Sequence, residues 1–241
     1  MLFPLRGGGG ILSISDNIRY KRTKEFYEQH GGVVDNLLKL GYPGLDKPIA
    51  RYNEFCKDKE ESNNNLIIFL SLPHSPFIEV LIELITESLQ NGYKVLYKTH
   101  GGHLELLDKE REIVKRWQDN EKFVVCYETL SDEILFESLC VVEFRSSILY
   151  TYPLITKKPA LYLQPQFESY NEEDNFYCSN LHIKIHNKEE FLDTLIKLQD
   201  ENFRVKRKDL IEEYINSCAY NLGGASYAVA DFVDIFLKKY I

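Results

Sequence analysis

The residues of this chain that are best suited to chemistry follow a short apolar segment. Lys98, His100 and Gly101 come at the end of the run that begins at Lys94. A cation and a titratable imidazole beside flexible glycine backbone suit an anion, because open parallel sheets bind ligands beyond the carboxyl ends of their strands. The same residues also fit a tight turn with a surface histidine, since short glycine motifs often occur by chance. Both interpretations stay open.

Two further polar segments follow apolar runs. Ser71 ends one run, before a stretch at 72–76 that contains Pro, His and Ser, and Arg145, Ser146 and Ser147 follow another. Hydroxyl groups and the amides of a helix N-terminus bind phosphate oxygens, and an arginine adds positive charge. Serines at these positions also cap helices, which is the alternative interpretation.

A fourth small-residue segment, with Gly223 and Gly224, precedes the final helical pattern. It is interpreted either as a loop that approaches an anion or as a helix terminator followed by a new helix start.

The elements that must position these residues alternate along the chain. Short apolar runs rich in β-formers alternate with segments of helical periodicity, which predicts an α/β fold with a mostly parallel sheet flanked by helices. Strands are expected at 66–71, 94–98, 123–127, 139–144, 159–163 and 181–185. Helices are expected at 77–89, 104–117, 189–199, 206–217 and 225–240.

The domain boundaries follow from composition. Residues 57–65 contain no apolar side chain and predict a linker. Residues 66–241 then form a Rossmann-like nucleotide-binding domain, and residues 1–56 are an appendage or the remnant of a preceding domain. Four successive glycines at 7–10 predict a flexible connector within that appendage.

Composition narrows the classes of function. The 241 residues carry a formal net charge of -8, which argues against a nucleic-acid binder with a broad basic face. The five cysteines are scattered without metal-like spacing, which favours a reducing cytoplasm and predicts no bound metal. No apolar run reaches the roughly 18 to 20 residues of a membrane span, so any membrane association is expected to be peripheral, at the inner face.

The order of these motifs resembles the C-terminal nucleotide-binding half of GT-B-fold transferases. The similarity is to the CDP-glycerol glycerophosphotransferase and capsule-polysaccharide glycosyltransferase groups. It comprises Lys-x-His-Gly after a strand, an acidic residue followed by Ser-Ser at a helix start, a Lys-Lys-Pro strand and a Gly-Ala-Ser loop. It covers 41–241, because Gly41, Pro43 and Asp46 are similar to the stretch by which those enzymes leave their N-terminal domain.

The resemblance implies a role for each matched residue. His100 would contact the diphosphate of a nucleotide-diphosphate or CMP-activated donor and stabilise the charge of the leaving nucleotide. Ser146 and Ser147 would hold phosphate oxygens, and Lys98 would add a point charge. The expected function is transfer of a glycosyl or glycerol-phosphate group to a surface polymer, such as a capsule or cell-wall polysaccharide, without a metal or other cofactor.

The chain also departs from that pattern. Gly101 stands where the family commonly has proline, and Tyr150, Thr151 and Tyr152 stand where an acidic residue often contacts ribose. One Rossmann-like half is expected from roughly 200 folded residues, so a missing N-terminal domain or a partner chain would supply the acceptor side. Two alternatives stay open: an enzyme similar to sugar-nucleotide 2-epimerases, and a non-catalytic nucleotide-binding module that acts as a scaffold.

Overall fold

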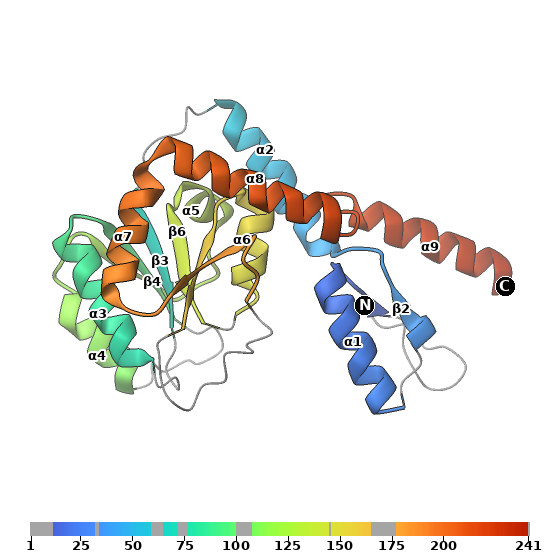
Figure 1. The fold of residues 1–241 in the computed structure, drawn as a ribbon, viewed down its shortest axis with the longest axis horizontal. Helices are drawn as coiled ribbons and strands as arrows, with labels where there is room; N and C mark the ends of the chain where they lie inside the picture. Colours follow the sequence, from blue (N-terminus) through green and yellow to red (C-terminus); the bar gives the residue numbers. More distant parts are fainter. Residues whose placement is uncertain are drawn as a thin grey trace. The chain divides into compact units, whose positions relative to one another are not determined.

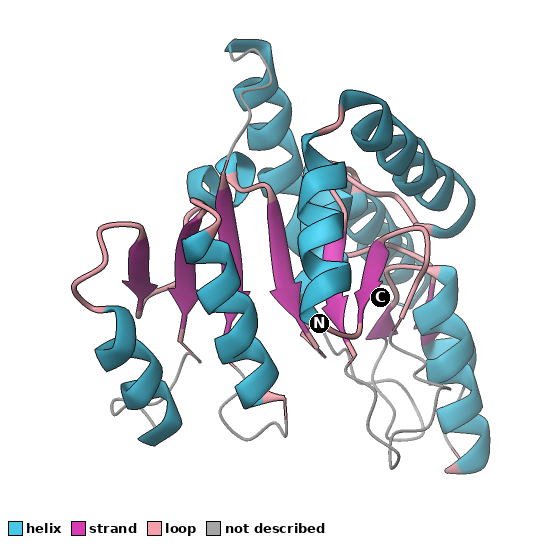
Figure 2. Cartoon of the chain, turned by 60° about the vertical axis from the view of Figure 1, so that its left-hand side comes forward, coloured by secondary structure: helices cyan, strands magenta, loops and turns pink. Residues whose placement is uncertain are grey.

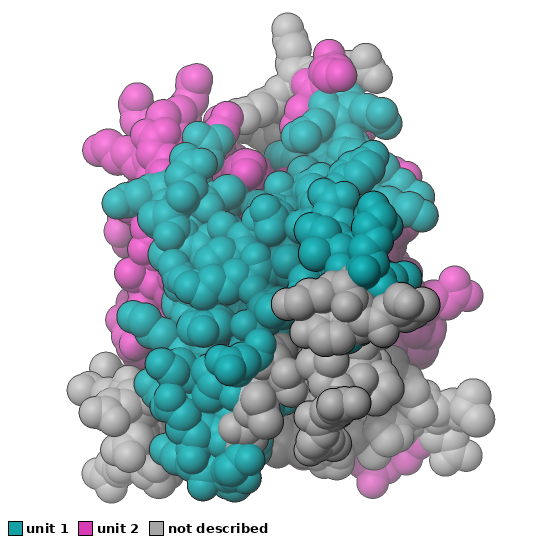
Figure 3. Space-filling view, turned by 90° about the vertical axis from the view of Figure 1, so that its right-hand side faces the viewer, with its two compact units in different colours: residues 1–54, 212–241 teal, residues 55–211 magenta. Residues whose placement is uncertain are grey.

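The structure is a computed structural model that describes residues 12–31, 34–58, 65–71, 77–99, 108–144, 146–164 and 177–240. It forms two compact units, one of residues 1–54 with 212–241 and one of residues 55–211, which Figure 3 colours separately. The boundaries between them fall inside two helices, α2 (Asp46–Asp58) and α8 (Glu201–Cys218).

The unit of residues 55–211 is built on one six-stranded parallel sheet. Its strands are β3 (Leu66–Leu70), β4 (Lys94–Lys98), β5 (Phe123–Cys126), β6 (Cys140–Glu143), β7 (Ala160–Leu163) and β8 (His182–Ile185). They lie in the order β5-β4-β3-β6-β7-β8, and every neighbouring pair is parallel, so that the arrowheads in Figure 2 point the same way. Numbered within the sheet, this is the 3-2-1-4-5-6 order of the Rossmann fold.

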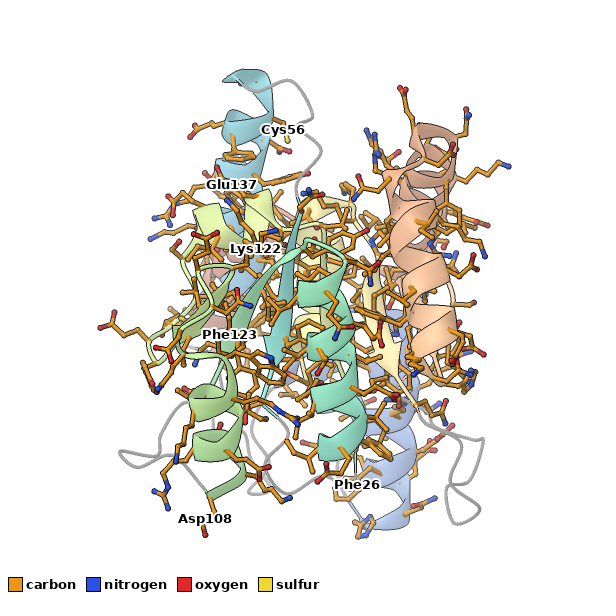
Figure 4. All side chains as sticks on the ribbon, turned by 90° about the vertical axis from the view of Figure 1, so that its left-hand side faces the viewer. Phe26, Cys56, Asp108, Lys122, Phe123 and Glu137 are labelled. Carbon is orange, nitrogen blue, oxygen red and sulfur yellow. The ribbon has the colours of Figure 1, made fainter. Side chains whose placement is uncertain are left out.

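Helices cover both faces of this sheet. α3 (Ile78–Gln90), α4 (Asp108–Trp117) and α7 (Lys188–Gln199) lie on one side, and α5 (Asp132–Glu137) and α6 (Ile148–Thr156) lie on the other (Figure 1). The strands read as continuous apolar runs because both of their faces are buried, as in β6 and β7, where all residues are buried. At the edge strand β5, the ring of Phe123, labelled in Figure 4, packs at 5.5 Å from Trp117.

A buried histidine joins β8 to helix α6. His182 is 1% exposed, and its Nδ1 accepts a hydrogen bond from the Cys178 amide at 3.0 Å. Its Nε2 then carries the proton and donates to the carbonyl oxygen of Leu149 on α6, also at 3.0 Å. The edge of the Tyr150 ring packs on the imidazole, with 5.0 Å between ring centroids. Burial lowers the pKa of His182 to about 4, so the ring is neutral in the folded protein.

The unit of residues 1–54 and 212–241 joins the two ends of the chain. It contains β1 (Leu12–Ser13), α1 (Asn17–Gln29), two 3-10 turns, η1 (Val34–Asn36) and η2 (Pro43–Leu45), β2 (Leu37–Leu38) and α9 (Ala225–Tyr240). β1 and β2 pair in parallel. The Tyr220 amide donates to the Ser15 carbonyl oxygen at 2.9 Å, and Asp16 pairs with Ala219 in an isolated bridge. Backbone hydrogen bonds therefore link segments about 200 residues apart.

The structure confirms the α/β, Rossmann-like fold and finds all six expected strands within one or two residues. The domain division differs from the sequence-based one. α2 runs through the expected boundary at residue 56 to Asp58, and residues 212–241 group with the N-terminal segment rather than with residues 66–211. The cause is the pairing of Ser15 and Asp16 with Ala219 and Tyr220, which sequence periodicity does not encode. The glycines at 7–10 lie outside the described residues.

We expect Gly41→Ala to destabilise the protein far more than Gly31→Ala. Both glycines have positive φ, +89° and +72°, which costs a non-glycine residue about 1 kcal/mol. A Cβ at residue 41 would also overlap the Tyr220 carbonyl oxygen and lie 2.8 Å from the Ala225 Cβ, whereas nothing lies within 4 Å at residue 31. Urea unfolding should show a loss above about 3 kcal/mol for Gly41→Ala. An equal loss of unfolding free energy in the two variants would contradict the close approach of Gly41 to Tyr220 and Ala225.

We expect acid to weaken the fold through His182. Its pKa is near 6.5 in the unfolded chain and about 4 in the folded protein, so the unfolded state binds the proton first as the pH falls. The free energy of unfolding should decrease by about 2 kcal/mol from this group between about pH 7.5 and about pH 5. Urea titrations at several pH values should show that His182→Gln is less stable near neutral pH. The free energy of unfolding of this variant should also lack the decrease with falling pH that His182 causes in the wild type. An identical pH dependence of the free energy of unfolding in both proteins would contradict the role of His182.

Candidate functional site

The order of the strands predicts where a ligand binds. β3 is the first strand of the sheet, and the chain continues to β4 on one side of it and reaches β6 on the other only after β5. The connections on the two sides of β3 therefore run over opposite faces of the sheet. At this switch point the loops diverge and leave a crevice beyond the carboxyl ends of β3 and β6.

A cavity of about 790 Å³ lies at this switch point. Its wall comes from the carboxyl ends of β3 and β4, the segment after β5, and helices α5 and α6. The lining residues are Leu70, Lys98, Tyr127, Glu128, Thr129, Leu130, Leu135, Ser147, Ile148 and Thr151. Aliphatic side chains thus face an ammonium group, a carboxylate and several hydroxyl groups, a combination suited to a small polar ligand with an apolar part.

Two of the predicted site residues, Lys98 and Ser147, line this same cavity. Lys98 is the register partner of Leu70, so both side chains point to the face of the sheet that α5 and α6 cover. The Lys98 Nζ donates to the carbonyl oxygen of Thr99 at 2.5 Å and is half-buried. A cation held at this strand end can attract an anionic ligand into the cavity.

The start of α6 leaves the hydroxyl group of Ser147 available to a ligand. Ser146 is used within the protein, because its amide donates to the buried carboxylate of Glu143 at 2.6 Å and its Oγ accepts from the Ile148 amide at 3.4 Å. Ser147 stands at the N-cap position, is exposed, and makes no capping bond with its side chain. Of the two predicted serines, Ser147 therefore faces the cavity, while Ser146 helps to shape the turn.

Ser71 lies on the other face of the sheet. Its side chain is 7% exposed and its hydroxyl donates to the carboxylate of Glu110, which is 2% exposed on α4. Burial, followed by the nearby Glu110 charge, raises the pKa of Tyr97 beside this pair, while its contact with Ser71 works in the opposite direction. Alternation along β3 explains the difference, since Leu70 points into the cavity and the next residue points away.

Gly223 and Gly224 belong to the other unit, with residues 1–54. Gly223 has φ +81°, as expected at a helix restart. The amides at the start of α9 are already occupied, because the Asp46 carboxylate accepts from Ala225 at 3.2 Å and from Ser226 at 2.7 Å. The anion at this helix N-terminus is thus a side chain of the protein itself, which satisfies the helix dipole. Sequence analysis did not assign this role to Asp46.

The remaining predicted residues, His100, Gly101 and Arg145, lie outside the described residues, and their roles stay predictions. Sequence analysis missed the segment 127–130, although it follows the carboxyl end of a predicted strand. It also missed Glu110, whose helical spacing to the buried Ile113 was the available signal. Thr151 lines the cavity, whereas its neighbours Tyr150 and Tyr152 are buried in the core.

The described residues lack both a cluster of metal-binding side chains and a membrane-spanning helix. None of their His, Cys, Asp and Glu side chains gather in groups of three or more that could hold a metal ion. None of their helices is long and apolar enough to cross a membrane.

Solved structures share this fold. A UDP-GlcNAc 2-epimerase from Neisseria meningitidis bound to UDP-GlcNAc matches with TM-score 0.54 and 12% identity. The match covers 90% of this chain and 59% of the epimerase chain. A glycosyltransferase from Rickettsia africae matches with TM-score 0.54 and 11% identity. The match covers 91% of this chain and 61% of that glycosyltransferase. WaaG, a glycosyltransferase involved in lipopolysaccharide biosynthesis, matches with TM-score 0.50 and 13% identity. The match covers 92% of this chain and 63% of the WaaG chain. The chain spans about three fifths of the length of these proteins, and such low identity shows the fold alone.

Sequence comparison identifies the family. Curated proteins gave no match. The family model of CDP-Glycerol:Poly(glycerophosphate) glycerophosphotransferase matches residues 72–234, which is more than half of the chain and includes all lining residues of the cavity except Leu70. With glycosyltransferases among the structural neighbours, this match confirms the predicted resemblance to GT-B transferases. The chain therefore belongs to the CDP-glycerol:poly(glycerophosphate) glycerophosphotransferase family.

Proposed function

We propose that this chain forms the donor-binding half of a transferase that moves glycerol phosphate from CDP-glycerol to a surface polymer. The observation that carries the proposal is the cavity at the switch point of a Rossmann-like sheet, lined by Lys98 and Ser147, within the region matched by the family. The epimerase alternative has only a structural likeness at 12% identity in its favour, which supports the fold and not the activity.

The proposed chemistry needs positioned charge rather than a covalent intermediate on the protein. A hydroxyl oxygen of the acceptor attacks the phosphorus that carries glycerol, a new oxygen–phosphorus bond forms, and the bond to the bridging oxygen breaks. CMP leaves with the electron pair of that bond, and the hydroxyl proton passes to a base on the acceptor side. In this proposal Lys98 and Ser147, which line the cavity, stabilise the negative charge that grows on the leaving phosphate.

The acceptor side is proposed to come from a further domain or a partner chain. The structures that share the fold are longer, with this chain covering 59% to 63% of three of them. We also propose that the reaction takes place in the cytoplasm and needs no bound metal. All five cysteines are free thiols, as expected for a reducing compartment.

We expect the folded chain to bind CDP and CDP-glycerol more tightly than UDP or GDP. Binding to the folded state should raise the melting temperature by mass action. Ser147→Ala and Lys98→Met should each raise the Kd for CDP about tenfold, because each removes a polar contact to a phosphate. Lys122→Met is the matched control, since Lys122 lies at the opposite, amino end of β5 (Figure 4). Absence of a nucleotide-dependent shift in folded protein would contradict the proposed function.

His100 gives a separate prediction. If it contacts the donor diphosphate, His100→Ala should weaken binding of CDP-glycerol, which contains the diphosphate, more than binding of CMP. Calorimetric titration of both ligands with the variant and the wild type measures this difference. Unchanged affinity for both ligands in folded variant protein would refute a role of His100 in the pocket.

A further inference from the structure

Gln164 presents a buried acceptor at the ligand-binding edge of the sheet. It follows β7 directly, and its backbone amide donates to the Ile185 carbonyl oxygen at 2.8 Å, which fixes the main chain. Its side chain is 7% exposed. The Oε1 atom is buried and has no hydrogen-bond partner among the residues that the structure describes.

Such a group needs an explanation, because a buried acceptor without a donor costs free energy that a methylene group at the same place would not. The side chain of Tyr162, two residues earlier and on the same face of the sheet, is also fully buried. A donor that arrives with a ligand would satisfy the amide oxygen.

Gln164 follows a strand at the same edge of the sheet as the cavity, although it is not one of the cavity-lining residues. Side chains alternate along an extended strand, so Gln164 points to the same face of the sheet as Tyr162. The Tyr162 ring stacks on His182, with 6.0 Å between centroids, and His182 donates to Leu149 on α6. Gln164 therefore lies on the face that α6 covers, at the edge where the first turn of α6 lines the cavity.

We propose that Gln164 recognises the nucleobase of the donor, with Oε1 accepting a hydrogen bond from the exocyclic amine of cytosine. This inference rests on the proposed function, which supplies a cytidine nucleotide. A carbonyl oxygen repels phosphate oxygens and requires an N–H or O–H donor. Uracil carries a carbonyl oxygen where cytosine carries its amine, so this contact favours CDP over UDP.

The test uses Gln164→Met, which keeps the unbranched shape and removes the acceptor, and Gln164→Leu as a second apolar variant. Without ligand, the melting temperature should rise by about 2–4 °C, because the unsatisfied acceptor is gone. The Kd for CDP should rise about tenfold, with the Kd for UDP unchanged. Gln199→Met is the matched control, since Gln199 donates to Asn65 at the protein surface. It should leave nucleotide affinity unchanged.

Several results would overturn the inference. A lower melting temperature in both apolar variants without ligand would show that Oε1 has a partner within the chain. Unchanged CDP affinity, or equal weakening of CDP and UDP, would remove the contact to the cytosine amine while leaving the proposed function intact. Failure of the wild-type protein to bind any cytidine nucleotide would overturn the proposed function and the inference together.

Discussion

Burial of the six-stranded parallel sheet on both faces is the constraint on which the nucleotide-binding unit depends. Parallel strands need crossover connections, and the helices that provide them cover both faces and exclude water. The strands must then be apolar along their whole length, as β6 and β7 are except at Glu143. Polar chemistry is consequently restricted to the strand ends, and the order of the strands opens one crevice there, between the loops that follow β3 and β6.

The buried polar groups of this unit are organised by the same constraint. Ser71 bonds to Glu110 on one face, and Glu143 holds the turn that begins α6 through the Ser146 amide. His182 ties α6 to β8 with both ring nitrogens engaged. These bonds satisfy groups that would otherwise be costly to bury, and the bonds of Glu143 and His182 hold α6, which forms one wall of the cavity. Three buried polar atoms of the described part of this unit depart from this pattern, the Tyr97 hydroxyl, the Arg207 Nε and the Gln164 Oε1, and the inference about a ligand uses the last of them.

The other unit depends on long-range contacts between the chain ends. Gly41 lies so close to Tyr220 and Ala225 that a side chain could not be accommodated, and Asp46 caps helix α9. Segments at opposite ends of the chain therefore form one folded unit, and the boundaries of both units fall inside helices α2 and α8. Cutting the chain between residues 57 and 66, as composition suggested, would separate α9 from its partners.

The sequence by itself determined the strands, the longer helices, the parallel sheet and the family, because apolar periodicity and strand-end motifs are local signals. It also indicated Lys98 and Ser147, which follow strands. Only the tertiary structure decided the rest. Alternation sends Ser71 away from the cavity, and a tertiary hydrogen bond makes Asp46 the anion at the glycine loop of residues 223–224. The cavity residues at 127–130 and the buried acceptor of Gln164 emerged only from packing, since burial depends on which distant elements come together.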